Sequence, residues 1–258
     1  MNEKPAAIAI VAHPDDIEFM MGGTLLMLQK KGWDVHYMAT ANGCCGTEKY
    51  DAKTIAAMRA GEMLASTKLA GMTWHPPICN DLEVFYNKEN VAKVLSVIRQ
   101  VKPKIVLTQS PDDYMEDHIN TCRLAVAAAF DRGMLNAPCE PPMSVFQDDI
   151  VVYHAIPHGL MDPFRRLLEP EIFVNVEPVM QMKWDMLACH KSQKEWLDQS
   201  QGFNSYIDDM VDRLVKTGEL CGKCKYAEGW FRHNPCGFCA EDYDPLRRDL
   251  KDFVIEKA

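Results

Sequence analysis

Histidine and aspartate side chains gather in one short stretch near the N-terminus. His13 is followed by Pro14, Asp15 and Asp16, and then by Glu18. His13 and Asp16 stand three positions apart and can converge on one metal ion, whereas the adjacent Asp15 points differently and can meet a water molecule on that ion. The alternative is a helix N-cap, because aspartate is common there and suits the positive end of the helix dipole.

A second chemically rich stretch lies much later in the chain and ends in a histidine. His118 would join His13 and Asp16 in a set of two histidines and one carboxylate. Such a set leaves one coordination position open, as expected for a catalytic zinc rather than a structural one. Alternatively, His118 caps a helix beside acidic neighbours. The residues that precede it are Asp112, Asp113, Tyr114, Met115, Glu116 and Asp117.

Both stretches follow apolar runs that predict strands. Residues 6–12 predict a first strand, residues 18–31 a helix, residues 34–40 a second strand and residues 105–108 a buried strand. A strand-helix-strand unit favours a parallel sheet, and open α/β sheets bind ligands at the carboxyl ends of their strands. The sequence therefore predicts an α/β, Rossmann-like fold with a mostly parallel sheet and helices on both faces.

The remaining chain continues this alternation. Two histidines, His154 and His158, are expected near the substrate, or one of them is a satisfied polar group at a strand end. Late aromatic residues are expected mainly in core packing, with sugar stacking as the alternative. These aromatic residues are Trp196, Phe203, Tyr206, Trp230 and Phe231. The predicted helices cover residues 54–69, 91–101, 122–130, 179–189 and 207–220, and the predicted strands cover residues 151–156 and 172–176.

Length and charge narrow the class of protein. A chain of 258 residues with 47% hydrophobic content can bury a substantial core, so one domain over 1–258 is expected, with residues 140–258 as a distal substrate-side and C-terminal extension. The net charge of -9 and the lack of a long basic run argue against a nucleic-acid partner and favour a small-molecule substrate. Without a signal peptide or membrane-spanning stretch, we expect a cytoplasmic protein with no membrane partner. An assembly of identical chains is left open.

Ten cysteines in such a protein favour free thiols or metal ligands over disulfides. Four late cysteines form two CxxC pairs separated by eleven residues, a set that could hold a structural zinc, although the interval is short for a zinc ribbon. These four are Cys221, Cys224, Cys236 and Cys239. The others are expected to be small buried or surface thiols, and they are Cys44, Cys45, Cys79, Cys122, Cys139 and Cys189.

The motifs and their order along the chain resemble those of one known family. Residues 13–18 (HPDDIE), residues 22–24 (GGT) and Asp117-His118 look like the zinc-dependent N-acetylglucosaminyl deacetylases called LmbE-like or PIG-L. The likeness covers most of residues 6–230, and its first motif is the most specific. Further matching positions are Thr40 to Gly43, Arg59 with Glu62, Lys183, His190 with Ser192 and Gln193, and Tyr226 to Glu228.

The resemblance implies a role for each residue of the first motif. Asp15 matches the general base that takes a proton from the attacking water. The zinc would make that water more acidic and polarise the amide carbonyl. The residues that match the zinc ligands are His13, Asp16 and His118.

Two further positions are expected to contact the substrate. Arg59 matches a sugar-contacting arginine, and Asp117 is assigned to the substrate beside the third ligand. The alternative for Arg59 is an exposed ion pair with Glu62 or Glu48, which would contribute little to stability.

One position departs from the family pattern. Relatives often carry His-Pro-Asp-His where residues 115–118 of this chain are Met-Glu-Asp-His, and the first of those histidines helps to stabilise the oxyanion or supplies a proton. The Met115 thioether cannot donate, and losing such a donor typically costs about a hundredfold or more in turnover. We expect Tyr114 to donate in its place, with His190 and His233 as alternatives from the distal half.

These features together predict a hydrolase. The expected function is a zinc-dependent amidohydrolase (deacetylase) that removes an N-acyl group, acetyl first, from an amino-sugar derivative. One alternative is an amidase of a larger thiol or antibiotic conjugate, and another is a non-catalytic zinc-containing relative that binds sugars. Asp15 favours catalysis, because a binding protein does not need a carboxylate beside its metal ligands.

Overall fold

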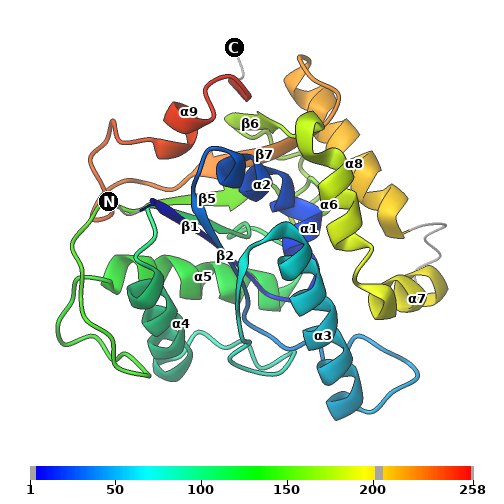
Figure 1. The fold of residues 1–258 in the computed structure, drawn as a ribbon, viewed down its shortest axis with the longest axis horizontal. Coiled ribbons are helices and arrows are strands. Elements are labelled where there is room, and N and C mark those ends of the chain that lie inside the picture. The colour runs from blue at the N-terminus through cyan, green and yellow to red at the C-terminus, as the bar shows by residue number, and fades with distance from the viewer. Residues whose placement is uncertain (1–3, 201–205, 257–258) are drawn as a thin grey trace.

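A single sheet runs through the molecule. The computed structural model (Figure 1) describes residues 4–200 and 206–256. Its strands lie in the order β3-β2-β1-β4-β5-β7-β6-β8. The first five strands in this order pair in parallel. They are β1 (Ala6–Val11), β2 (Asp34–Ala39), β3 (Thr73–His75), β4 (Ile105–Thr108) and β5 (Val151–Ala155).

The far edge of the sheet is antiparallel. Strand β7 (Ala227–Arg232) pairs antiparallel with β5 and with β6 (Ile172–Asn175), and β6 pairs antiparallel with β8 (Val254–Glu256). The predicted α/β fold with a mostly parallel sheet is therefore confirmed. Strands β3, β7 and β8 were not predicted, because two of them have three residues and β7 interrupts its apolar pattern with Glu228 and Gly229.

The helices differ from their predicted bounds in two places that matter. The helix expected over 18–31 breaks at Met21 into α1 (Asp16–Met20) and α2 (Gly22–Lys30). The helix expected from Cys122 already begins at the start of α5 (Glu116–Asp131), which places His118 in its first turn. The others are α3 (Ala52–Ala70), α4 (Lys88–Val101), η1 (Glu177–Val179), α6 (Met180–Leu187), α7 (Lys191–Ser200), α8 (Tyr206–Cys221) and α9 (Pro245–Asp249).

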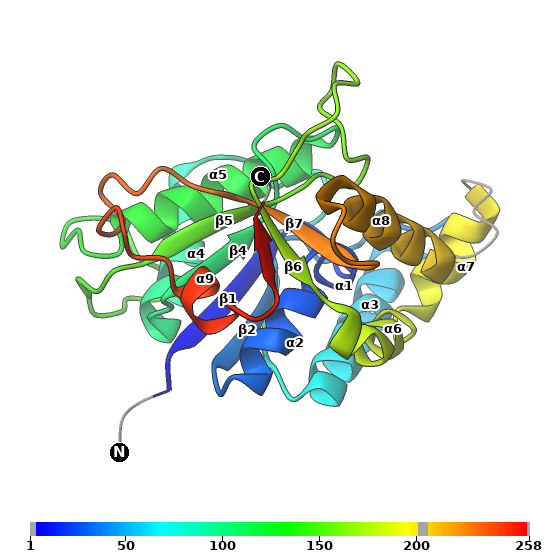
Figure 2. The ribbon, with the colours of Figure 1, turned by 90° about the horizontal axis from the view of Figure 1, so that it is seen from above.

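Strand β1 separates two hydrophobic cores. Its residues Ala7, Ala9 and Val11 face one core and Ile8 and Ile10 face the other, as the twofold alternation of a strand requires. Helices α4 and α5 cover the second core, while α2, α3 and α6 lie on the opposite side of the sheet (Figure 2). Because both faces are covered, β1 is apolar along its whole length.

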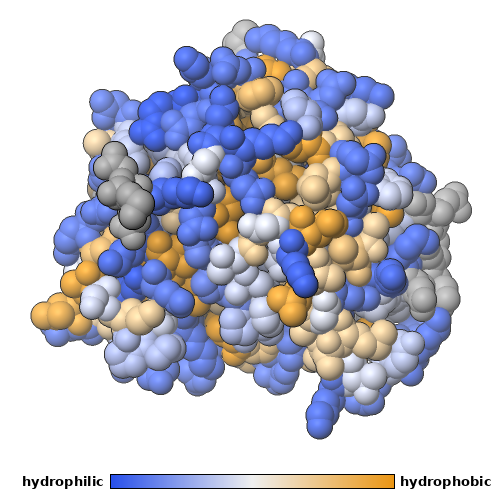
Figure 3. Space-filling model, viewed as in Figure 1, coloured by the Kyte–Doolittle hydropathy of each residue, from blue (hydrophilic) through white to orange (hydrophobic). Residues whose placement is uncertain are grey.

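The outer surface mixes hydrophilic residues with small hydrophobic patches on the face drawn in Figure 3. The large hydrophobic side chains that are exposed come from helices α3, α5 and α6 as well as from several loops, and Leu82, Leu135 and Phe164 are the most exposed among them. Over residues 4–200 and 206–256, the helices include none that is both long and apolar enough to cross a bilayer.

A buried ion pair joins the break between α1 and α2 to the distal half of the chain. The Lys183 Nζ atom donates to the backbone oxygens of Glu18 (2.5 Å) and Phe19 (3.2 Å) at the end of α1. It also lies 2.7 Å from Glu228 Oε1, and both side chains are almost completely buried. The Glu228 carboxylate in turn accepts from the backbone N–H groups of Gly23 (2.8 Å) and Thr24 (2.7 Å) in the first turn of α2. Lys183 therefore satisfies backbone oxygens at the C-terminal end of α1, and Glu228 satisfies backbone N–H groups at the N-terminal end of α2. Each charge has the sign that the helix dipole favours at that end.

Gly23 is needed for this close approach. A Cβ atom at position 23 would lie 2.5 Å from Cγ1 of Val176 and 2.9 Å from the Glu228 carboxylate, closer than real Cβ contacts. Any side chain here would push β6 and β7 away from α2. The glycine of the GGT motif is thus explained by packing.

Lys183→Met should destabilise the protein by about 3–5 kcal/mol, because it leaves the Glu228 charge buried without its partner. The added substitution Glu228→Gln should recover part of that loss, since it removes the unpaired charge. Urea denaturation measures both effects. As a matched control, Lys93→Met on the exposed pair with Glu89 should have a much smaller effect. Equal losses for Lys183→Met and Lys93→Met would contradict the role assigned to the buried pair.

Candidate active site

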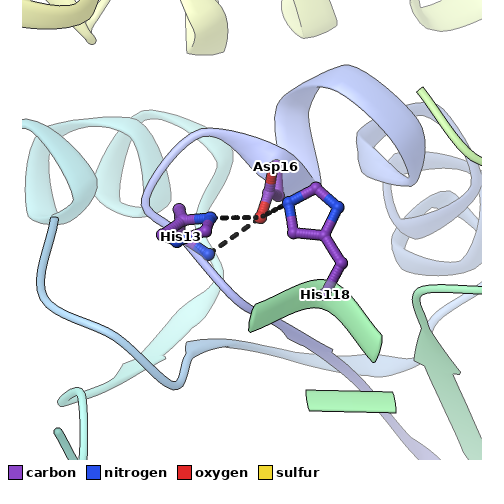
Figure 4. A group of neighbouring side chains, drawn as sticks. All are labelled: His13, Asp16 and His118. Carbon is purple, nitrogen blue, oxygen red and sulfur yellow. Dashed lines mark hydrogen bonds and ion pairs between the residues drawn. The ribbon is translucent and has the colours of Figure 1, made fainter. Parts of the chain in front are cut away.

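Three side chains from the two motifs meet at the carboxyl ends of β1 and β4. His13 and Asp16 come from the turn after β1 and the start of α1, and His118 reaches them from α5 (Figure 4). Asp16 Oδ2 lies 3.6 Å from His13 Nδ1 and 3.5 Å from His118 Nε2. All three ligand atoms lie within 4.8 Å of one another. The structure therefore brings the predicted ligand set together.

The spacing fits a zinc ion. Tetrahedral zinc with bonds of about 2.0–2.1 Å to nitrogen and oxygen separates its ligand atoms by about 3.4 Å, close to the distances from Asp16 to the two histidines. Each imidazole also turns its second nitrogen towards a carboxylate: His13 Nε2 lies 3.2 Å from Asp117 Oδ2, and His118 Nδ1 lies 3.1 Å from Asp113 Oδ1. Carboxylates in that position orient metal-bound histidines and strengthen them as ligands.

The electrostatics of the cluster favour a cation. Burial lowers the pKa of His13, but Asp117 and Asp16 outweigh it and raise that pKa to about 10. Burial likewise acts against protonation of His118, whose pKa is nevertheless raised by Asp16 and Asp113. The carboxylates thus hold positive charge on the imidazoles, and a bound metal would replace those protons.

The Asp16 carboxylate is held by a residue that the sequence did not identify. Gln109, directly after β4, donates from Nε2 to Asp16 Oδ2 at 3.0 Å and accepts from the backbone N–H of Ala12 at 2.9 Å. The backbone N–H of His13 also donates to Asp16 Oδ2 at 2.8 Å. Gln109 therefore ties the ends of β1 and β4 together around the ligand. The sequence offered one signal for Gln109, because it is a polar residue directly after a predicted strand.

Asp15 sits beside the ligands in an unusual backbone conformation. Its φ of 101° is rare for a residue with a side chain, and such strain typically marks functional sites. Its carboxylate accepts from the Tyr206 hydroxyl and, at 3.2 Å, from Arg59 Nη2. Burial raises the pKa of Asp15, while Arg59 and Tyr206 oppose that rise. These two partners fix the carboxylate and favour its charged form.

Arg59 is buried, so the predicted alternative of an exposed ion pair with Glu62 or Glu48 is wrong. Besides Asp15, its guanidinium donates to the backbone oxygens of Pro14 (2.5 Å) and Gly43 (3.4 Å). Glu62 instead accepts from Ser192 of α7. Helix α3 turns Arg59 inwards because the turn at Pro14 and Asp15 offers oxygen atoms that need donors.

A cavity of about 260 Å³ opens in front of the cluster, at the carboxyl ends of the parallel strands. Of the residues expected to contact the substrate, Arg59, Tyr114 and Asp117 line it. Met115 also faces the cavity, and the Tyr114 side chain is 60% exposed at its rim. Asp117 additionally accepts from the backbone N–H of Leu82 at 2.9 Å. His158, one of the two histidines expected near the substrate, lines the cavity as well, and lining residues that were not assigned to the site include Phe19, Leu82, Trp196, Tyr206 and Asp209.

His190 lies elsewhere. Its imidazole is fully buried, with Nε2 3.1 Å from Glu18 Oε1, and it is not among the described residues that line the cavity. Burial raises the pKa of Glu18, but His190 and the hydroxyls of Ser66 and Tyr37 outweigh it and leave that pKa below its ordinary value. His190 therefore pairs with Glu18 of α1 and does not face the cavity.

His154 in β5 and His158 just after it lie in different surroundings. His158 lines the cavity, and its Nε2 lies 3.6 Å from Asp209 Oδ2 of α8, which also accepts from Arg213. Burial and Arg213 lower the pKa of His158 to about 4, so its imidazole is neutral at pH 7. His154 points away, to the backbone oxygen of Gln109 (3.0 Å) and to His233 (2.9 Å).

The late aromatic residues were predicted to pack mainly in the core, and only some of them do. Trp230 is buried in the core, whereas Trp196 and Tyr206 line the cavity, and Phe203 lies outside the described residues. The sulfur atoms of Cys221 and Cys224 are 3.4 Å apart, while Cys239 lies against Arg232. Within the described chain, the four late cysteines do not form one group of ligand atoms within 4.8 Å.

Comparison with known proteins agrees with this architecture. Residues 8–129 match the sequence profile of the family PIG-L: GlcNAc-PI de-N-acetylase. The chain is 27% identical over 242 residues to diacetylchitobiose deacetylase from Thermococcus kodakarensis, covering 88% of this chain and 83% of that protein. It is 24% identical over 198 residues to 4-oxalmesaconate hydratase from Pseudomonas putida, covering 73% of this chain and 74% of that one.

The fold is also shared with a solved structure. N,N'-diacetylchitobiose deacetylase from Pyrococcus horikoshii, complexed with its inhibitor MPG, superposes with a TM-score of 0.73 at 21% identity, covering 95% of this chain and 89% of that one. Sheet order and flanking helices thus define an α/β protein with its site at the carboxyl ends of the strands. Residues 8–129 thus match the PIG-L family, and the resemblance seen in the motifs is confirmed.

His154 should make stability depend on pH. Burial lowers the pKa of His154 to about 4 from an ordinary 6.5, so the unfolded chain binds more protons between those pH values and stability falls as the pH drops from 6.5 to 4. The loss is at most about 3 kcal/mol, since one pKa unit corresponds to about 1.4 kcal/mol. In His154→Gln, urea denaturation should show a shallower decline over this range. An unchanged slope would contradict the prediction.

Proposed function

We propose that this protein is a zinc-dependent amidohydrolase that removes an N-acyl group, acetyl first, from an amino-sugar derivative. The observation that carries the proposal is the position of Asp15, whose carboxylate is fixed by Arg59 and Tyr206 next to the convergent His13, Asp16 and His118. Two relatives, diacetylchitobiose deacetylase and 4-oxalmesaconate hydratase, are enzymes, which supports an enzyme rather than a binding protein.

The residues divide the chemistry between them. His13, Asp16 and His118 would hold the zinc, which supplies a Lewis acid for the amide carbonyl and lowers the pKa of water. Asp15 takes a proton from the attacking water and returns it to the leaving amine. Arg59 and Tyr206 keep the Asp15 carboxylate oriented, and Asp113 and Asp117 keep the two imidazoles oriented.

The donor at the oxyanion is assigned to Tyr114. Its ring lies 5.7 Å from the His118 ring, at the cavity rim and directly before the thioether of Met115. His158, a neutral imidazole whose ring lies 6.4 Å from that of Tyr114, replaces His190 as the second candidate, because it faces the cavity. Either would donate to a developing negative charge without changing its own charge first.

A larger conjugate is the second candidate substrate. The cavity is bordered by Leu82 and Tyr114, which are 72% and 60% exposed, and by Trp196, so its rim offers apolar surface beyond the needs of an acetyl group. A panel of N,N'-diacetylchitobiose, N-acetylglucosamine and N-acyl amino sugars with apolar aglycones tests both, with release of a primary amine as the readout. No amine release from any amide, together with hydration of an unsaturated dicarboxylate, would overturn the proposal.

The metal-site variants should separate binding from turnover. His13→Ala, Asp16→Ala and His118→Ala should each lose bound zinc, measured by atomic emission after dialysis. Asp15→Asn should keep the zinc and lose about a hundred- to ten-thousandfold in kcat, because an amide cannot accept the proton.

Asp112→Asn provides the matched control, because Asp112 is exposed and lies outside the cavity lining. It should leave both zinc content and kcat unchanged. Wild-type turnover in Asp15→Asn would move the general base to another residue.

Tyr114→Phe should lower kcat about a hundredfold with little change in KM, because its hydrogen bond forms mainly in the transition state. Met115→His should partly restore turnover in that background. Tyr86→Phe, an exposed tyrosine stacked on Arg123, serves as the control and should have no effect. If Tyr114→Phe is fully active while His158→Gln is not, the donor is His158.

A further inference from the structure

A second group of metal-binding side chains lies on the wall of the same cavity. Cys44, Cys45 and Asp81 offer three ligand atoms within 4.8 Å of one another. Cys45 and Asp81 line the cavity together with His13 and Asp117. We propose that Cys44, Cys45 and Asp81 form a second metal site, which takes a thiophilic divalent cation such as Zn²⁺ or Cd²⁺ and, when filled, blocks that side of the active-site cavity.

The sulfur atoms have the spacing that such a cation requires. Adjacent side chains in an extended strand point in opposite directions, yet the Sγ atoms of Cys44 and Cys45 lie only 3.9 Å apart. Two thiolates on tetrahedral zinc, with bonds of about 2.3 Å, are separated by about 3.8 Å. The turn that follows β2 therefore presents the two thiols as one bidentate pair.

Asp81 holds this turn in place. Its Oδ1 accepts from the backbone N–H of Gly43 at 2.6 Å and its Oδ2 from that of Cys45 at 2.8 Å. Asn42 accepts from the backbone N–H of Cys44 at 3.1 Å, and Gln193 of α7 donates to the backbone oxygen of Gly46 at 2.9 Å. Each carboxylate oxygen keeps a further lone pair for a cation. The ligand atoms are thus positioned before any metal binds, which reduces the cost of binding.

Gly43 explains why the turn exists at this point. Its φ is +77°, and a Cβ atom there would lie 2.5 Å from Cδ of Arg59. The same arginine that holds Asp15 therefore packs against the backbone of this turn. The proposed second site and the Asp15 carboxylate share a common support.

Filling the second site would reach the catalytic cluster through short contacts. Leu82, next to Asp81, donates its backbone N–H to Asp117, and Asp117 contacts His13. A cation at Asp81 therefore lies beside the carboxylate that orients a metal ligand. Because thiols must lose their protons to bind a metal, binding releases protons and the affinity should increase with pH.

Cadmium titration followed by ultraviolet absorption tests the site directly. Thiolate coordination produces a charge-transfer band, whereas the cluster of His13, Asp16 and His118 contains no sulfur. The other close thiol pair, Cys221 and Cys224 with sulfurs 3.4 Å apart, provides the matched control. The band should appear in the wild type and in C221S/C224S, and should be absent from C44S/C45S. A band that survives in C44S/C45S, or that is missing from the wild type or from C221S/C224S, would overturn the proposal.

The effect on the active site is measured separately, and only this step rests on the proposed function. Excess Zn²⁺, relative to one equivalent, should lower amide hydrolysis at least tenfold in the wild type and in C221S/C224S. In C44S/C45S, the activity with excess Zn²⁺ should be close to the activity with one equivalent. Equal inhibition in all three proteins would remove the blocking role. Absence of amide hydrolysis in every protein would refute the proposed function, while the cadmium band would still decide whether the second site exists.

Discussion

The buried ion pair of Lys183 and Glu228 is the interaction on which the site depends. Two opposite charges without water must be paired and hydrogen-bonded, and here they are satisfied by the facing ends of α1 and α2. The chain can only break at Met21 and restart because these partners come from α6 and β7. Since α1 begins with Asp16, the pair also fixes the first ligand turn. The distal half therefore supports the ligand turn from behind, and it also lines the cavity with side chains such as His158, Trp196 and Tyr206.

Polar groups around the site are arranged in layers. Behind the ligands, Gln109, Asp113 and Asp117 orient Asp16 and the two imidazoles. Beside them, Arg59 and Tyr206 hold Asp15 in a strained backbone conformation. A rigid arrangement of this kind places the proposed general base and the proposed metal ligands next to one cavity before substrate arrives, which is how preorganised sites lower reorganisation during reaction.

The sequence predicted the fold class and the convergence of His13, Asp16 and His118, because strands of a parallel sheet end at one edge and both motifs follow strands. It did not predict the partners of these residues. Tyr206 reaches Asp15 from a separate helix 191 positions later, and nothing in its neighbourhood signals that contact. The sequence also left open an exposed ion pair for Arg59, which the burial of this side chain excludes. Short strands such as β3 and β8 were missed because three residues carry no periodicity.

We propose that the first zinc ion binds two imidazoles and one carboxylate. Zinc K-edge X-ray absorption of the protein loaded with one equivalent tests it most directly. We expect a shell of nitrogen and oxygen at about 2.0–2.1 Å with imidazole scattering and no sulfur. A sulfur shell at about 2.3 Å would contradict it, because the first metal would then occupy a cysteine site instead.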